Sequence, residues 1–289
     1  MQMDYPLEHH IVYTNGQQLH VVQCGPVAGP LVILLHGFPE FWYSWRRQLP
    51  ALASAGNRVW APDQRGYNLS DKPAGSRAYR LPTLAADIIG LLDAAGRPQA
   101  AVVGHDWGGL VAWYLATYHA DRLRRVMILN VPHPAVLPRA FWRVPGQLLR
   151  SWYIFFFQLP WLPEKLFRRR SWHFGVQSLL RTSRPGTFSV ADLERYKQAW
   201  AQPQALTSML NWYRALRYGA GMPRQRPVRV NVPVQLIWGR QDVFLAARLA
   251  ELSIALCAQG QLHYFPQATH WVQLEEAEAV NSLLTGFLA

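Results

Sequence analysis

The chain has few cysteines and lacks any long, uninterrupted apolar run. Its 289 residues include only two cysteines, Cys24 and Cys257, which are too few for a disulfide-rich scaffold. The most apolar window, around residues 154–157, is interrupted by Gln158 and Pro160, so it is too short to span a bilayer. The sequence therefore excludes a small disulfide-stapled domain and predicts no transmembrane helix.

Acidic residues are also scarce, and the first ten residues contain no apolar segment. We therefore expect no signal peptide and a cytoplasmic protein. The chain has 29 basic and 17 acidic residues, a formal net charge of +12, yet only 16% of its residues are charged and 50% are hydrophobic. A disordered chain would combine low hydrophobicity with high charge, so this composition predicts a folded domain with a large core.

The excess of basic residues is greatest between residues 139 and 184, where nine basic residues stand against one acid, Glu164. Mixed with tryptophan and phenylalanine, they could bind a membrane surface or an anionic ligand. The simpler interpretation, which we favour here, is a solvated face whose arginine stems cover apolar helices. No nucleic-acid recognition motif accompanies the charge, so we expect no nucleic-acid partner.

Short apolar runs alternate with helical patterns along most of the chain. A hairpin is predicted where segments 11–13 and 19–22 flank an Asn-Gly turn at 15–16. Buried strands are predicted at 31–35, 58–61, 100–103, 126–129 and 234–238, with a short one at 262–265. Helices are predicted at 44–55, 81–95, 108–118, 248–256 and 277–287. This alternation predicts an α/β fold with a mostly parallel, doubly wound sheet.

The alternation stops between residues 134 and 221, where the pattern is helical with proline breaks. It resumes afterwards, so we predict a core built from residues 1–133 and 222–289. Residues 134–221 would form an inserted helical cap.

One predicted strand-to-helix turn carries the clearest chemical signal. Residues 104–109 read GHDWGG, which matches the nucleophile-elbow pattern G-x-S-x-G with aspartate in place of serine. The tight turn needs small residues on either side, and Gly104 and Gly108 meet that need. The sequence therefore predicts that Asp106 is exposed as a nucleophile.

A carboxylate nucleophile suits displacement at saturated carbon, which gives an alkyl-enzyme ester that water can hydrolyse. The electrophile is then an epoxide or an alkyl halide. Residues 36–40, HGFPE, follow the first buried strand. The backbone N–H of Phe38 and that of Trp107 are predicted to form the oxyanion hole for ester hydrolysis.

The acid and the base follow Asp106 in the order expected for this elbow. Asp242 lies just after the strand at 234–238, and His270 follows the last predicted strand. His270 would deprotonate the hydrolytic water while Asp242 orients its ring. An acid after an earlier strand would fall at Asn130, whose amide cannot supply the charge, so Asp242 is preferred.

These motifs resemble the epoxide hydrolases of the α/β-hydrolase fold. The resemblance runs from about residue 31 to residue 288 and adds segments 42–46 (WYSWR), 157–160 (FQLP) and 211–214 (NWYR). It implies an α/β-hydrolase fold with a cap that carries two catalytic tyrosines, Tyr153 and Tyr213, to donate protons to the epoxide oxygen. Trp161 departs from the family pattern, because a glycine often follows the proline.

The function that the resemblance implies is addition of water to a small apolar epoxide to give a vicinal diol, with no metal and no cofactor. Expected substrate-binding residues are Trp107, Phe38, Pro39 and Trp271. The alternative is a haloalkane dehalogenase, which shares the nucleophile and the base, although Phe38 stands where that family often has asparagine. A silent ligand-binding or membrane-surface protein is a third hypothesis. The sequence indicates no oligomeric state.

Overall fold

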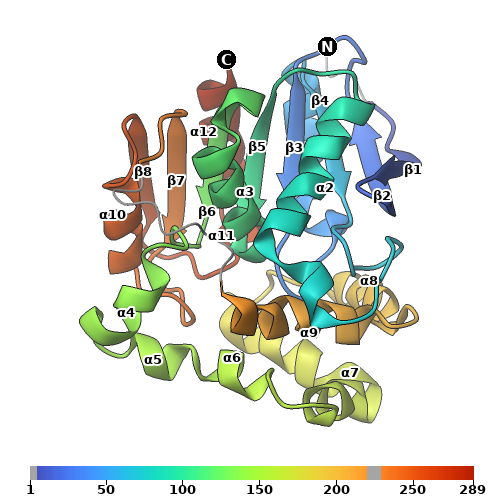
Figure 1. Ribbon diagram of the computed structural model, residues 1–289, viewed down its shortest axis with the longest axis vertical. Helices are drawn as coiled ribbons and strands as arrows, with labels where there is room; N and C mark the ends of the chain where they lie inside the picture. The colour runs from blue at the N-terminus through green and yellow to red at the C-terminus, as the bar shows by residue number, and fades with distance from the viewer. Residues whose placement is uncertain (1–4, 220–228) are drawn as a thin grey trace.

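The computed structural model describes residues 5–219 and 229–289, and Figure 1 shows the sheet standing above a layer of helices. Eight described strands form one sheet in the order β1-β2-β4-β3-β5-β6-β7-β8. β1 and β2 are antiparallel to their neighbours, and all other pairs are parallel. The strands are β1 (Glu8–Thr14), β2 (Gln17–Cys24), β3 (Leu31–Leu35), β4 (Arg58–Pro62), β5 (Ala100–His105), β6 (Leu123–Leu129), β7 (Val234–Gly239) and β8 (Gly260–Phe265).

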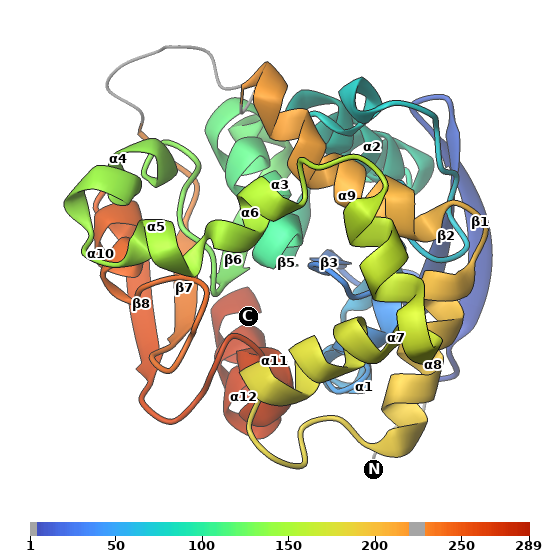
Figure 2. The same ribbon diagram turned by 90° about the horizontal axis from the view of Figure 1, so that it is seen from below.

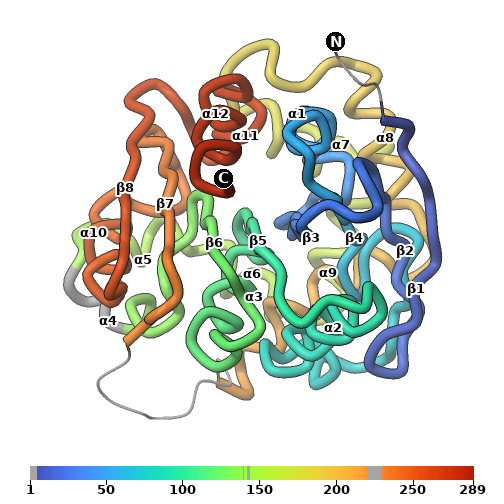
Figure 3. The backbone as a smooth tube through the Cα atoms, turned by 90° about the horizontal axis from the view of Figure 1, so that it is seen from above, coloured from blue at the N-terminus to red at the C-terminus, as the bar shows by residue number. Residues whose placement is uncertain are grey.

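Helices cover both faces of this sheet. Figure 3 shows α1 and α12 on one face and α2 and α3 on the other. The α-helices of the sheet region are α1 (Gln48–Ser54), α2 (Leu81–Ala94), α3 (Asp106–Tyr118), α10 (Arg248–Ile254), α11 (Val272–Glu275) and α12 (Ala277–Leu288). Short 3₁₀ helices are η1 (Trp42–Trp45), η2 (Ser76–Tyr79) and η3 (Ala120–Arg122). β3, β5 and β7 are buried at every position, because they are covered on both sides. The predicted α/β-hydrolase sheet is confirmed.

Two predicted helices differ in detail from the observed ones. The single helix predicted at 44–55 is instead η1 followed by α1. Pro50 is the physical reason, since proline is tolerated in the first turn of a helix but not in its interior, and α1 begins two residues before it. α3 begins at Asp106, two residues earlier than predicted. The predicted hairpin is present, and Asn15 and Gly16 both take positive φ angles in its turn.

A second group of helices lies between β6 and β7 in the chain. They are α4 (Leu137–Arg143), α5 (Gln147–Arg150), α6 (Trp152–Phe156), α7 (Leu162–Thr182), α8 (Val190–Ala201), α9 (Ala205–Arg214) and η4 (Ala215–Tyr218). Figures 1 and 2 show this helical layer along the edge of the sheet where the parallel strands end. α7 is broken by non-helical residues at 169–172. The predicted end of the cap, between 221 and 222, lies outside the described residues.

The carboxyl ends of neighbouring parallel strands share this edge of the sheet, which is where α/β sheets place their ligand sites. β3, β5, β7 and β8 all end there, and the loops that follow them carry the predicted site residues. Within the described residues, no helix is long and apolar enough to cross a membrane.

Candidate active site

Asp106 lies in a strained turn between β5 and α3. Its φ is +50°, in the left-handed region that non-glycine residues rarely adopt. A side chain at Gly108 would bring its Cβ within 2.1 Å of the Leu35 carbonyl oxygen, and one at Gly104 within 2.4 Å of the Gly108 carbonyl oxygen. The two glycines therefore allow the backbone to fold closely enough to lift Asp106 out of the sheet edge, as an elbow requires.

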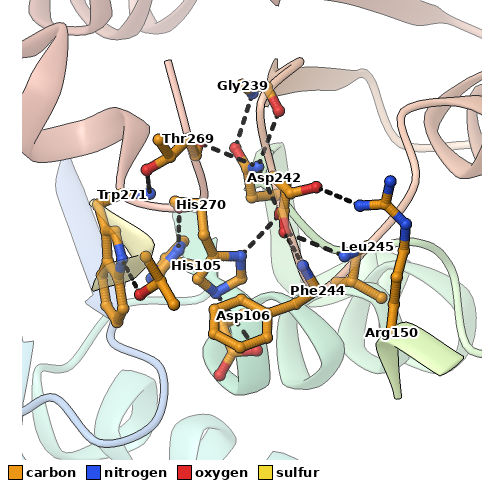
Figure 4. A network of polar contacts seen from close by, with 12 residues as sticks. His105, Asp106, Arg150, Gly239, Asp242, Phe244, Leu245, Thr269, His270 and Trp271 are labelled. Atoms are coloured by element: carbon orange, nitrogen blue, oxygen red, sulfur yellow. Dashed lines mark hydrogen bonds and ion pairs between the residues drawn. The ribbon is translucent and has the colours of Figure 1, made fainter. Parts of the chain in front are cut away.

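Asp106, His270 and Asp242 form a chain of contacts (Figure 4). Nε2 of His270 lies 3.7 Å from Oδ2 of Asp106, and Nδ1 lies 2.8 Å from Oδ2 of Asp242. All three side chains are largely buried, and the cavity next to Asp106 also borders His270. The structure thus brings the predicted nucleophile, base and acid together in the predicted order.

The carboxylate of Asp242 is held by four hydrogen bonds. Oδ1 accepts from the backbone N–H groups of Phe244 and Leu245, at 2.7 and 3.0 Å. Oδ2 accepts from Nδ1 of His270 and from Nδ2 of Asn130, the latter at 2.8 Å. Asn130, which sequence analysis had set aside as an acid, is therefore a partner that orients Asp242.

Electrostatics favour a charged His270. Burial alone would lower its pKa, but the carboxylates of Asp242, Asp106 and Glu40 outweigh burial and raise the pKa to about 9. Burial alone would likewise raise the pKa of Asp242, but His270 and the hydrogen bonds to the carboxylate lower it. The pair is thus an imidazolium facing a carboxylate while Asp106 is ionised.

The loop after β3 closes over Asp106 from the other side. The backbone N–H of Phe38 donates to Oδ1 of Asp106 at 2.9 Å. Gly37 approaches so closely that an added Cβ would lie 2.5 Å from the Cβ of Asp106. Because the Phe38 N–H already points at this carboxylate, it lies where an oxyanion donor is needed.

Sequence analysis missed a buried polar cluster behind this loop. Oε2 of Glu40 accepts from the Gly37 N–H at 3.0 Å and lies 2.7 Å from Nδ1 of His105. Nε2 of His105 donates to the carbonyl oxygen of His270 at 2.9 Å, and Gln273 reaches both Glu40 and His105. The cluster ties the β3 loop, the elbow and the His270 loop together. Only its place within the HGFPE motif could have indicated Glu40.

Tyr153 on α6 and Tyr213 on α9 lie side by side above Asp106. Their ring centroids are 5.9 Å apart, and both residues line the same cavity as Asp106. Burial and the nearby charge of Asp106 raise the pKa of each phenol well above its usual value. Both are therefore protonated at neutral pH and able to donate.

Trp107 and Gln158 support Tyr213. The ring of Trp107 packs edge-on against the ring of Tyr213, with the ring centroids 5.0 Å apart. Nε2 of Gln158 donates to the backbone carbonyl of Tyr213 at 2.9 Å. Through Gln158, the segment that carries Tyr153 is therefore bonded to the helix that carries Tyr213.

The cavity is lined mainly by aromatic side chains from the sheet edge and the helical layer. Of the predicted substrate-binding residues, Phe38, Pro39 and Trp271 border it, whereas Trp107 lies behind Tyr213 and is not part of the lining. Further lining residues, which sequence analysis did not select, are Trp152, Phe157, Phe167, Phe174, Ser178 and Phe244. No sequence signal separates these aromatics from ordinary packing residues. Among the described residues, no group of three or more metal-ligating side chains could hold a metal ion.

Comparisons with known proteins identify the family of this chain. The family model for the alpha/beta hydrolase fold matches residues 30–277. The chain is 47% identical to the AB hydrolase superfamily protein YfhM of Bacillus subtilis, over 96% of each chain. It is 38% identical to the protein named Epoxide hydrolase 4 of Homo sapiens, over 95% of this chain and 76% of the relative.

Solved structures of epoxide hydrolases share the fold of this chain. A Bacillus megaterium epoxide hydrolase in complex with an inhibitor superposes with a TM-score of 0.88 at 27% identity, covering 96% of this chain and 99% of that one. The epoxide hydrolase VrEH1 of Vigna radiata superposes with a TM-score of 0.83 at 30% identity, over 98% of both chains. The likeness thus includes the helical layer as well as the sheet.

Proposed function

Because this chain belongs to the epoxide hydrolases of the α/β-hydrolase fold, we propose that it adds water to an epoxide through a covalent ester on Asp106. The observation that carries the proposal is the arrangement around one carboxylate. Asp106 has a histidine–aspartate pair on one side and two protonated phenols across the cavity.

In the first step, the Asp106 carboxylate attacks an epoxide carbon and the carbon–oxygen bond of the ring breaks. The departing oxygen becomes an alkoxide, which needs a proton or strong donors. Tyr153 and Tyr213 are both protonated and border the same cavity, so they stabilise that oxygen. The product of the step is an alkyl ester between Asp106 and the substrate.

Ester formation also prepares the base. The negative charge of Asp106 is one of the causes that raise the pKa of His270, and esterification removes it. The pKa of His270 then falls, and the proton that it loses balances the proton taken up by the alkoxide. The neutral imidazole, held by Asp242, can accept a proton from water.

In the second step, water activated by His270 attacks the carboxyl carbon of Asp106. The tetrahedral oxyanion forms where Phe38 now donates to Oδ1, and the backbone N–H of Trp107, in the first turn of α3, is the second donor. Collapse of this intermediate releases the diol and restores the Asp106 carboxylate.

We further propose that residues 134–221 act as a cap that supplies the tyrosines and an aromatic wall for a small apolar epoxide. The lining aromatics from α6 and α7 favour such a substrate over a charged one. No step in this scheme requires a metal or an organic cofactor.

The test is turnover of a panel of aryl and aliphatic epoxides beside matched bromoalkanes, all in the presence of a chelator. We expect diol from the epoxides and little alcohol from the bromoalkanes, with activity lost in Asp106→Asn. The matched control Asp93→Asn changes an exposed carboxylate and should keep full activity. Efficient debromination without epoxide turnover would replace this proposal with a haloalkane dehalogenase.

A further inference from the structure

The outer surface of α5, α6 and the following loop exposes an unusual concentration of large apolar side chains. Six of the sixteen large apolar side chains exposed in the described residues fall between positions 148 and 161. They are Leu148, Leu149, Trp152, Phe155, Leu159 and Trp161. Leu149 is 79% exposed and Trp161 is 67% exposed, so water contacts most of their surface. Single exposed apolar residues need no explanation, but a cluster of this kind indicates an interaction site.

Basic side chains border this cluster. Lys165, Arg168, Arg169 and Arg170 are exposed on α7 just beyond Trp161. Arg150 lies within the cluster, but its guanidinium donates to the backbone carbonyl of Asp242 at 2.8 Å. A surface groove is lined by Trp161, Glu164, Lys165, Arg168, Arg169 and Thr207. We call these exposed apolar and basic residues together the cap patch.

Little negative charge opposes the basic groups of the cap patch. Glu164 is the one acid between residues 139 and 184, and both its oxygens are held by Arg214, at 2.7 and 3.0 Å. Because Glu164 is already paired with Arg214, the basic side chains of the groove keep their net positive charge. Its chemistry fits a phosphate or carboxylate headgroup.

The helices that carry the cap patch lie on one outward face of the molecule. Figure 2, seen from the side of the helical layer, shows α5, α6 and α7 crossing this face in front of the sheet. Surfaces that bind at a lipid–water interface combine tryptophan, phenylalanine and leucine with arginine and lysine. The net charge of +12 adds a long-range attraction to an anionic bilayer.

We propose that the cap patch docks this protein onto the surface of an anionic lipid bilayer. Leu149, Phe155 and Trp161 insert among the acyl chains near the headgroups, and the arginines of α7 bind the headgroups. The simpler interpretation of the basic residues as a solvated face leaves the exposed aromatics beside them unexplained.

Docking also has a consequence for the active site, one that rests on the proposed function. Trp152 belongs to the cap patch, being 57% exposed, and it also lines the cavity that contains Asp106. The cavity therefore reaches the surface at the docking face. An apolar epoxide dissolved in the bilayer would enter from the lipid side without crossing water.

The direct test is flotation of the protein with vesicles of pure phosphatidylcholine or of phosphatidylcholine with about 30% phosphatidylserine. We expect binding to the anionic vesicles only, weakened when salt rises from about 0.1 M to about 1 M and the Debye length falls from ~10 to ~3 Å. Leu149→Ser/Phe155→Ser should bind about 10-fold or more weakly because two apolar side chains no longer enter the interface. Arg168→Gln/Arg169→Gln should lose a similar factor.

Matched controls make the same chemical changes elsewhere. Ile11→Ser/Val27→Ser alters two exposed apolar residues in and after the first hairpin, outside the helical layer. Arg97→Gln/Arg124→Gln removes two charges near the amino ends of β5 and β6, far from the helical layer. Both controls should bind like the wild type.

The proposal is overturned if the wild type does not float with anionic vesicles, or if cap-patch and control variants bind equally. Concentration-dependent dimers that the Leu149→Ser/Phe155→Ser change abolishes, without vesicle binding, would also overturn it in favour of a second copy. Flotation does not depend on turnover, so its result tests membrane binding independently of the proposed reaction.

Substrate entry is tested by activity. Leu149→Ser/Phe155→Ser should lose rate on a lipophilic epoxide held in anionic vesicles while keeping its rate on dissolved styrene oxide. Equal rates on the vesicle-held epoxide would contradict entry through the docking face.

Discussion

The charge of Asp106 is the part of the site that changes during the proposed reaction, and His270 responds to it. With Asp106 ionised, the pKa of His270 is about 9, so the histidine is protonated and is not a base. Once Asp106 is esterified, one of the charges that raise this pKa is gone. Loss of that charge lowers the pKa of His270, which favours its action as a base in the second half-reaction.

Replacing His270 should separate these half-reactions. In His270→Gln, Asp106 can still be alkylated but water is not activated, so the ester accumulates and steady-state turnover falls by roughly 10⁴-fold or more. Intact-protein mass spectrometry after addition of substrate should show the enzyme plus one substrate mass. His10→Gln, an exposed histidine on β1, serves as the control and should turn over normally. Normal turnover in His270→Gln would exclude this histidine as the base.

The two phenols share one task, so their loss should not be additive. Tyr153→Phe or Tyr213→Phe alone leaves one donor in the cavity, and alkylation should slow but continue. The double variant leaves none, and it should lose at least the ~10²–10⁴-fold that a general acid contributes. Tyr13→Phe, at a tyrosine that is 70% exposed, is the control. Pre-steady-state alkylation that is as fast in the double variant as in the wild type would make these tyrosines packing residues.

Among the elements, the β-strands and the elbow were predictable because their signals are local. Strands buried on both faces are apolar at every position, and a tight strand-to-helix turn requires its glycines. The break between η1 and α1 was missed, because the predicted helix at 44–55 ran through residues 46 and 47 without a break. The partners of Asp242 and Tyr213 were missed for another reason. Asn130 and Gln158 meet them only through long-range folding, which single-sequence periodicity does not report.

Two helical glycines with opposite surroundings test the elbow as an element. Gly108→Ala in α3 would place a methyl group 2.1 Å from the backbone carbonyl of Leu35, and we expect a loss of about 3 kcal/mol or more of unfolding free energy. Gly286→Ala in α12 meets nothing within 4 Å and should stabilise the protein by about 0.5–1 kcal/mol through helix propensity. Urea unfolding of both variants checks this. A Gly108→Ala protein as stable as the wild type would contradict the close approach at the elbow.

At the scale of the whole molecule, the ionisable groups of the site make the free energy of unfolding depend on pH. His270 has a raised native pKa, so its stabilising contribution is fully present below about 6.5, its unfolded value, and is lost as pH rises through about 9. Asp242 has a lowered native pKa, so its contribution is present above its unfolded value of about 3.9 and is lost as pH falls through the native value.

We therefore expect the wild-type unfolding free energy to fall as pH rises from about 6.5 to about 9, while His270→Gln lacks that part of the slope. Urea unfolding of both proteins across this range measures the difference. Parallel curves would mean that His270 is not charged against Asp242 and Asp106 in the folded protein.

The parallel sheet decides which parts of the site could be predicted from the sequence. The order of nucleophile, acid and base along the chain was readable, and the parallel sheet brings them to one edge. The aromatic residues that line the cavity could not be predicted. The sequence gives no signal that separates Phe157 and Phe167, which line it, from Trp107, which the fold places behind Tyr213.

The central claim, a covalent ester on Asp106, is tested most directly by a single turnover in water enriched with oxygen-18. With enzyme in excess over epoxide, the diol oxygen comes from the carboxylate of Asp106, and the solvent oxygen enters that carboxylate. Mass spectrometry should then find the first diol unlabelled and the Asp106 peptide heavier by one oxygen-18. A labelled first diol with an unlabelled Asp106 peptide would mean direct attack by water on the epoxide and would contradict the account.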